Sequence, residues 1–150
     1  MQKADGMNYA PTGGAKPVVE KGAFPIGAIG LDHGHIYGMC NGLTEAGATI
    51  RLVWDSDPEK VKKFIETYTE AKPARSKQEV LDDPEIKLIA SAAIPSHRCE
   101  IGCEALEHDK DYFVDKAPMT TLGQLATARA KVAATGKKYA VYYSERLHTE

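Results

Sequence analysis

From Phe24 onward, two patterns of apolar and polar residues alternate along the chain. Short apolar runs that stop at a glycine or a polar residue predict buried strands, and apolar residues at i, i+3, i+4 and i+7 predict helices. The strands are expected in six segments: from Phe24 to the glycine at 30, and at 49–54, 74–75, 87–93, 112–115 and 139–143. The helices are expected between them, at 36–47, 58–68, 77–81, 96–106 and 122–135.

Residues that cap helices support these boundaries. Asp57 precedes a proline that suits the first helical position. Ser76 and Thr121 each stand three residues before Glu or Gln, which is the capping-box spacing, and Ser96 is expected to cap the fourth helix. Gly47 and Gly136 suit the ends of the first and fifth helices. Two helix faces are expected to be buried: Cys99, Cys103 and Leu106 on the fourth helix, and Leu122, Leu125, Ala128 and Val132 on the fifth.

Strands that alternate with helices through short connections indicate an α/β fold. Right-handed crossovers would then give a doubly wound parallel sheet of about six strands with helices on both faces. Residues 1–22 carry glycines, prolines and lysines without a period, so they are expected to form a flexible leader. Residues 23–146 are expected to form one domain.

Composition excludes several classes of function. The chain has 150 residues, of which 43% are hydrophobic, and a net charge of −2 without a basic stripe, so nucleic acid is not an expected partner. No apolar run approaches the ~20 residues of a membrane span, and no signal peptide is evident, so the expected location is cytoplasmic. Cys40, Cys99 and Cys103 are an odd set without a fourth ligand, and they are expected to be small buried residues.

The turn after the first strand carries the strongest chemical signal. In doubly wound folds this turn holds a dinucleotide pyrophosphate through glycines at the first, third and sixth positions. Here Gly30 takes the first position, Asp32 the third and His35 the sixth, with His33 and Gly34 between them. The Asp32 carboxylate would repel a pyrophosphate, or it could cap the next helix. The turn therefore predicts either dinucleotide binding or a merely structural bend.

Residues after three other strands would share the same edge of the sheet. Asp55 lies 25 residues after Gly30 and could accept hydrogen bonds from the ribose hydroxyls of NAD, or it could simply begin a helix. Ile94, Pro95 and Ser96 follow the fourth strand. Lys116 follows the fifth and could approach a reacting oxygen or the cofactor ribose, or it could be a solvated loop lysine.

Two histidines near this edge are candidate metal ligands. His33 and His35 could chelate an ion, but Asp32 is the only acidic residue near them in the sequence, so no metal is predicted and a place near a ligand phosphate is favoured. His97 is expected to lie on the surface. Tyr142, Tyr143 and Arg146 could serve an interdomain surface or plain packing.

Taken together, four segments resemble the Gfo/Idh/MocA oxidoreductase family over about residues 24–146. They are Ile29–Ile36, Arg75–Leu88, Ala92–Ser96 and Asp115–Pro118. The resemblance implies a Rossmann domain that binds NAD, with NADP possible, followed in the family by a substrate domain. It also implies a sugar, cyclitol or related polyol as substrate, and homo-oligomers.

The same resemblance assigns roles to particular residues. The glycine-rich turn falls on 30–35, the cofactor-selecting residue on Asp55 and the proline-containing loop on 94–96. Asp115–Pro118 is similar to the family's Glu-Lys-Pro motif, so Lys116 inherits the catalytic role, although the proline is displaced by one position. The family's catalytic histidine lies in its C-terminal half, so the chain is expected to be the N-terminal, cofactor-binding part of a longer enzyme.

Two other functions remain open at this point. A methyltransferase that uses S-adenosylmethionine also has glycines after its first strand and an acid after its second, but its fold ends in an antiparallel strand pair. A Rossmann-like sensing or interaction module that has lost cofactor affinity through Asp32 would be non-catalytic.

Overall fold

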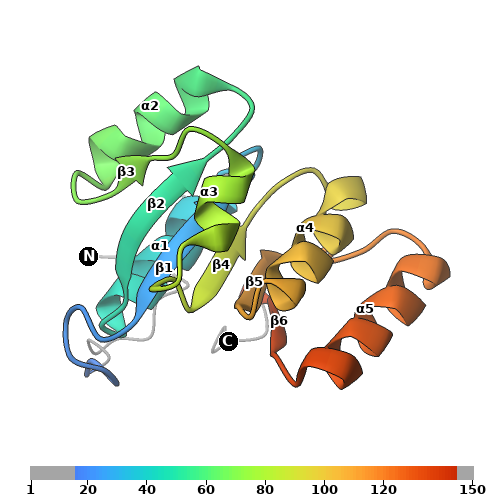
Figure 1. Cartoon of the computed structure of the whole chain (residues 1–150). Helices are drawn as coiled ribbons and strands as arrows, with labels where there is room; N and C mark the ends of the chain where they lie inside the picture. The colour runs from blue at the N-terminus through green and yellow to red at the C-terminus, as the bar shows by residue number, and fades with distance from the viewer. Residues whose placement is uncertain (1–15, 145–150) are drawn as a thin grey trace, which may run out of the picture.

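A parallel sheet with helices on both faces organises the protein (Figure 1). The computed structural model describes residues 16–144. Along the chain, the elements are β1 (Pro25–Ile29), α1 (His35–Glu45), β2 (Thr49–Trp54), α2 (Pro58–Thr67), β3 (Lys72–Pro73), α3 (Lys77–Asp82), β4 (Leu88–Ser91), α4 (Pro95–Glu107), β5 (Asp111–Asp115), α5 (Leu122–Thr135) and β6 (Tyr139–Tyr142).

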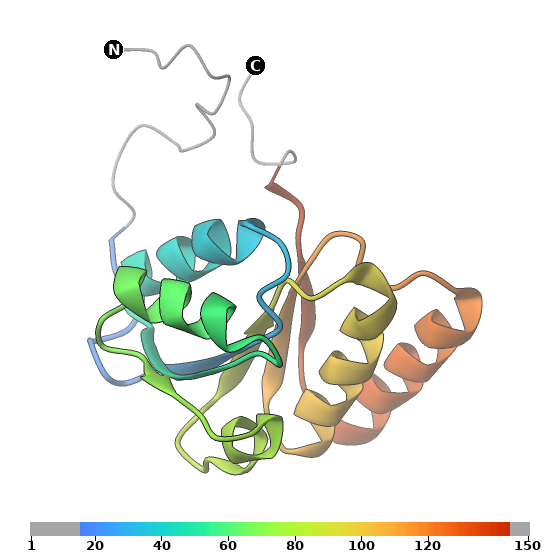
Figure 2. The same ribbon diagram turned by 90° about the horizontal axis from the view of Figure 1, so that it is seen from above.

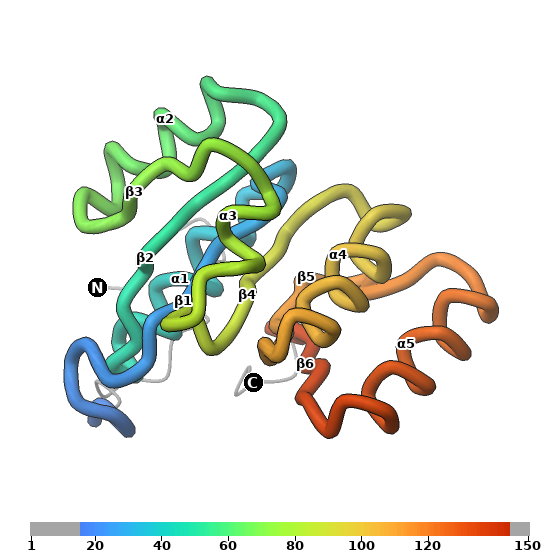
Figure 3. Tube along the Cα trace, viewed as in Figure 1, coloured from blue at the N-terminus to red at the C-terminus, as the bar shows by residue number. Residues whose placement is uncertain are grey.

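The six strands lie in the order β3-β2-β1-β4-β5-β6. The chain builds outward from β1 to β3, crosses back to place β4 beside β1, and then builds outward the other way (Figure 3). Every neighbouring pair is parallel, including β5 and β6. The predicted doubly wound sheet is therefore confirmed. The methyltransferase alternative is wrong, because β6 does not form the antiparallel pair that this fold requires.

Two apolar cores, one on each face, hold the helices to the sheet. Figure 2 shows α1 and α2 on one face and α3, α4 and α5 on the other. Ile36, Met39 and Phe64 from α1 and α2 are almost fully buried in the first core. Val80 and Leu106 from α3 and α4 are equally buried in the second. On α1 and α2, the helical spacing of apolar residues thus identified the faces that pack on the sheet.

The predicted caps are largely confirmed. The side chains of Asp57, Ser76 and Thr121 accept hydrogen bonds from backbone N–H groups in the first turns of α2, α3 and α5. Ser96 does not cap α4, which begins one residue earlier at Pro95 because a proline loses no hydrogen bond at the first helical position. Gly136 ends α5 in the left-handed conformation, with φ of 68°.

Three other expectations need correction. Strand β3 pairs through Lys72 and Pro73 rather than 74–75, since these residues lie opposite Leu52 and Val53. Strand β4 is confined to Leu88–Ser91, shorter than expected. On α5, Ala128 is buried, but Leu122 and Leu125 are exposed because this helix packs on α4 at the end of the molecule and covers little of the sheet.

The expected leader lies mostly outside the described residues, as do Arg146 and the predicted end of the domain. The part from 16 to 22 forms no helix or strand. The backbone N–H groups of Val18 and Val19 donate to the carbonyl of Ala46, so this part of the chain packs on the corner between α1 and β2. None of the described helices combines the length and apolarity of a membrane-crossing segment.

Candidate functional site

The carboxyl ends of β1, β2, β4 and β5 form one rim of the sheet, and the predicted site residues lie along it. Backbone hydrogen bonds tie the connections together: Gly30 N donates to Trp54 O at 3.2 Å, Ala92 N to Gly30 O at 3.0 Å, and His33 N to Ala92 O at 2.9 Å. The turn after β1 is therefore bonded directly to the ends of β2 and β4. In doubly wound sheets, ligands bind at this end, where the strand order reverses.

Gly30 is required by its conformation and its close packing. Its φ is 78°, and a Cβ added here would lie 2.6 Å from the Cβ of Ala93. A larger residue would therefore push the turn away from the β4–α4 connection. A Cβ added at Gly34, which precedes α1, would meet no atom within 4 Å other than those of its chain neighbours. The first turn of α1 itself contains no acidic residue.

Asp32 links three parts of the rim. One carboxylate oxygen accepts a hydrogen bond from Ile94 N at 3.1 Å, and the other lies 2.5 Å from the Nζ of Lys60 on α2. The hydrogen bond to Asp32 raises the pKa of Lys60. Asp32 is not the cap of α1, because Gly34 occupies the cap position. Its negative charge is instead offset by Lys60, a residue that the sequence did not single out.

Asp55 is a buried support of the turn. Its carboxylate accepts hydrogen bonds from Leu31 N at 2.6 Å and from Asp57 N at 2.9 Å. The helix-capping role belongs to Asp57, whose side chain accepts from Glu59 N. Asp55 thus fixes the shape of the turn after β1 from the end of β2. A role in binding ribose stays a prediction.

At the other end of the rim, Asp115 meets two histidines from the turn after β1. His35 Nδ1 lies 2.9 Å from one carboxylate oxygen, and His33 Nδ1 lies 3.7 Å from the other. The side chain of Asp115 is only 2% exposed, whereas that of His33 is 55% exposed. The sequence placed Asp115 beside Lys116 but gave no sign that it would contact residues 80 positions away.

Arg98 is a buried cation that joins the loops after β4 and β5. Its Nη2 lies 3.0 Å from Asp115 Oδ2. Its other nitrogens donate to the carbonyls of Ala93, Lys116 and Ala117. Arg98 was not among the residues predicted from the sequence. One signal was available: Arg98 lies three residues before Ile101, on a helix face that is otherwise apolar. A guanidinium buried on such a face must have polar partners.

Lys116 lies on the rim, as predicted, and is partly exposed. Arg98 holds its carbonyl, and the Lys116–Ala117 peptide bond is cis. Of the residues after β4, Ile94 binds Asp32 through its backbone, and Pro95 and Ser96 begin α4. His97 is exposed on the first turn of α4, as expected. The rim thus gathers all the predicted positions.

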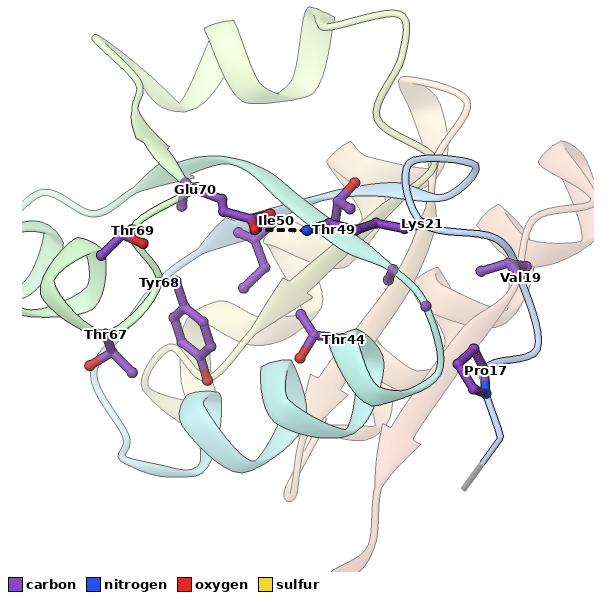
Figure 4. A pocket seen from close by; sticks show the side chains of 13 residues that line it. Pro17, Val19, Lys21, Thr44, Thr49, Ile50, Thr67, Tyr68, Thr69 and Glu70 are labelled. Atoms are coloured by element: carbon purple, nitrogen blue, oxygen red, sulfur yellow. Dashed lines mark hydrogen bonds and ion pairs between the residues drawn. The ribbon is translucent and has the colours of Figure 1, made fainter. Parts of the chain in front are cut away.

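Two hollows lie at opposite ends of the sheet. A cavity of about 230 Å³ lies at the rim, between the ends of β1, β2 and β4 and the start of α4, and Gly30, Asp32 and Asp55 line it. A second hollow of about 480 Å³ lies at the opposite end of the sheet, near the start of β2, where the Lys21–Glu70 ion pair spans 3.0 Å (Figure 4). The second lies away from the end where ligands bind in this fold, so the rim is the candidate site.

The cysteines are buried, as predicted. Burial raises the pKa of Cys40 to about 12 and that of Cys103 to about 11. A thiol must lose its proton to bind a metal well, so these side chains behave as small apolar groups.

Comparison with known proteins agrees with this geometry. A family model described as "Oxidoreductase family, NAD-binding Rossmann fold", of Gfo/Idh/MocA proteins, matches residues 26–143. No match is found among curated protein sequences.

Solved structures show the same fold. A candidate oxidoreductase from Erwinia carotovora atroseptica SCRI1043 is 42% identical, with a TM-score of 0.79 over 81% of this chain and 37% of its own. Myo-inositol dehydrogenase from Lactobacillus casei, solved with NAD(H) and myo-inositol, is 24% identical, with a TM-score of 0.71 over 80% of this chain and 36% of its own. Biliverdin reductase from Synechocystis sp. PCC 6803, solved with biliverdin and NADP+, is 21% identical, with a TM-score of 0.71 over 83% and 39%. The chain thus spans well under half the length of each.

Proposed function

Because the chain belongs to the Gfo/Idh/MocA oxidoreductase family, which has an NAD-binding Rossmann fold, we propose that residues 23–146 bind the nicotinamide dinucleotide of an enzyme that transfers hydride between this cofactor and a sugar, cyclitol or related polyol. A separate substrate domain would supply the rest of the active site.

The observation that carries the proposal is that Gly30, Asp55, the loop at 94–96 and Lys116 follow four parallel strands and share one rim. A dinucleotide binds along such a rim with its pyrophosphate at the start of the first helix. The residues present suit this ligand: no acidic residue lies in the first turn of α1, and Lys60 offsets the charge of Asp32.

Each group then has a defined task. The backbone from 30 to 35, including Asp32, His33, Gly34 and His35, would surround the pyrophosphate. Asp55 would accept hydrogen bonds from the adenosine ribose, which favours NAD over NADP, because a carboxylate repels a 2′-phosphate. The loop at 94–96 would contact the nicotinamide half.

Lys116 is the residue of this chain that would act in the chemical step. Its ammonium would donate a hydrogen bond to the substrate oxygen, which is negatively charged as an alkoxide before hydride leaves and becomes so again when hydride is added to the carbonyl. Arg98 would hold the backbone of Lys116 in place through the carbonyl hydrogen bond. The bound cofactor supplies the hydride acceptor or donor, and binding both reactants side by side supplies much of the rate enhancement.

A non-catalytic sensing or interaction module is the second candidate. The specific observation in its favour is the Asp32 carboxylate in the turn, where a glycine suits a pyrophosphate. Under this alternative, the ion pair with Lys60 holds the turn in shape without a ligand.

Titration with NADH and NADPH, followed by nicotinamide fluorescence, separates these two functions. We expect saturable NADH binding below about 1 mM, with weaker NADPH binding. Glu45→Gln at the far end of α1 is the matched control for loss of one carboxylate. If the native chain binds neither cofactor and Asp32→Gly restores binding, the result supports the non-catalytic module.

We expect a cytoplasmic enzyme that forms homo-oligomers. Size-exclusion chromatography with light scattering would measure the oligomeric state.

A further inference from the structure

Two histidines and one carboxylate converge at the rim, next to the pyrophosphate-binding turn proposed above. His33, His35 and Asp115 each offer one ligand atom, and these atoms all lie within 4.8 Å of one another. From this geometry we infer that the three side chains form a binding site for a first-row divalent cation, of which Zn²⁺ is the representative ion.

The spacing fits a tetrahedral ion. Zn–N and Zn–O bonds of about 2.0–2.1 Å place neighbouring ligand atoms about 3.3–3.4 Å apart. His35 Nδ1 lies 2.9 Å from Asp115 Oδ1, slightly closer than this value, and His33 Nδ1 lies 3.7 Å from the second oxygen, Oδ2. With one ligand atom from each residue, no separation exceeds 4.8 Å. Rotation of the two imidazoles would bring their nitrogens around one ion, which would take the place of the direct His35–Asp115 contact and of the hydrogen bond that His33 Nδ1 accepts from His35 N.

The type of donor favours a cation over an anion. Imidazole nitrogens with a carboxylate oxygen suit zinc and related first-row ions. A phosphate oxygen in the same position would face the negative charge of Asp115, which is buried and cannot turn toward solvent. Ligand sets of two histidines and one carboxylate leave a fourth position for water, and the exposed side of His33 provides access for it.

Arg98 orients the carboxylate. Its Nη2 binds Oδ2 of Asp115, so Oδ1 is directed to His35. Metal-binding carboxylates are commonly held in this way by a hydrogen bond from a neighbouring group. The positive charge of Arg98 lowers the affinity for a cation. The guanidinium also donates hydrogen bonds to three backbone carbonyls, whose partial negative charges offset part of this effect.

The site joins distant parts of the chain. Residues 33 and 35 belong to the turn before α1, and Asp115 ends β5. A bound ion would therefore link the connection after β1 to the loop that carries Lys116. This inference does not depend on cofactor binding, because the ligands are all side chains of this chain.

Isothermal titration of the full chain with ZnCl₂, without nicotinamide cofactor, tests the site. We expect one ion per chain and an affinity that falls about 10-fold or more in His33→Ala and in His35→Ala. His97→Ala removes an exposed histidine from the same rim and should leave the affinity unchanged. Circular dichroism would verify that each variant is folded. His33 is exposed, so its replacement should not disturb the core.

Co²⁺ provides a second measurement. Its visible absorption should indicate four or five nitrogen and oxygen ligands, and the spectrum should change in both histidine variants. The inference is overturned if Zn²⁺ does not bind stoichiometrically, or if both histidine variants bind it as the native chain does. A thiolate-to-cobalt charge-transfer band would also overturn it, because the ion would then be bound by cysteine.

Discussion

The two ends of the rim are built from the same kinds of charge but in different surroundings. Near β2, Asp32 pairs with Lys60, and both side chains are about one-third exposed. Near β5, Asp115 pairs with Arg98, and both are 2% exposed. A similar distance between opposite charges therefore has different consequences: water screens the first pair, whereas the second pair depends on partners within the protein.

Removal of the buried cation should have the largest effect. Arg98→Ala leaves the Asp115 carboxylate buried beside unpaired carbonyls, so we expect a loss of about 3–5 kcal/mol in the free energy of unfolding. Urea denaturation followed by circular dichroism would measure it. Arg129→Ala, on the exposed side of α5, is the matched control and should change stability by less than about 0.5 kcal/mol. Equal effects of the two substitutions would contradict the comparison.

The turn between the two ends should be next in sensitivity. Gly30→Ala combines a left-handed backbone with a Cβ only 2.6 Å from that of Ala93, so a loss of about 2–4 kcal/mol is expected. Gly42→Ala is the control, because this glycine lies in α1 with no atom near the added Cβ. It should stabilise the protein by about 0.5–1 kcal/mol. A Gly30→Ala variant as stable as the native protein would contradict the close packing at Gly30.

The exposed pair should give the smallest effect, visible at high pH. The hydrogen bond to Asp32 raises the folded-state pKa of Lys60 above 10.5, so its contribution is fully present below pH 10.5 and is lost as pH rises through the folded pKa. Because solvent screens the pair, this contribution should be under about 1 kcal/mol. Thermal melts from pH 8 to 12 should show a shallower alkaline loss in Lys60→Met, but not in Lys63→Met on the same helix.

Local patterns predicted most of the fold. The caps at Asp57, Ser76 and Thr121 are read from neighbouring residues, and the alternation of strands and helices indicates the parallel sheet. The structure departs from these expectations where tertiary packing decides, as on α5, where an apolar spacing at Leu122 and Leu125 produced no burial.

The candidate site was predicted less completely. The order of strands in such a sheet brings 30, 55, 94 and 116 to one rim, so their neighbourhood follows from topology. The residues that pair with the charged groups at this rim do not follow from topology. Lys60 and Asp32 are 28 positions apart, and Arg98 and Asp115 are 17 apart, so no local spacing connects them. For the same reason, the contacts of the Asp115 carboxylate with His33 and His35 could not be predicted from the sequence.

The carbonyl contacts of Arg98 have a consequence for how the molecule moves. Because one side chain on α4 grips the peptide groups on either side of Ala117, the segment after β5 cannot swing independently of that helix. Lys116 is therefore held rigidly relative to α4, and a ligand that displaced α4 would also move Lys116.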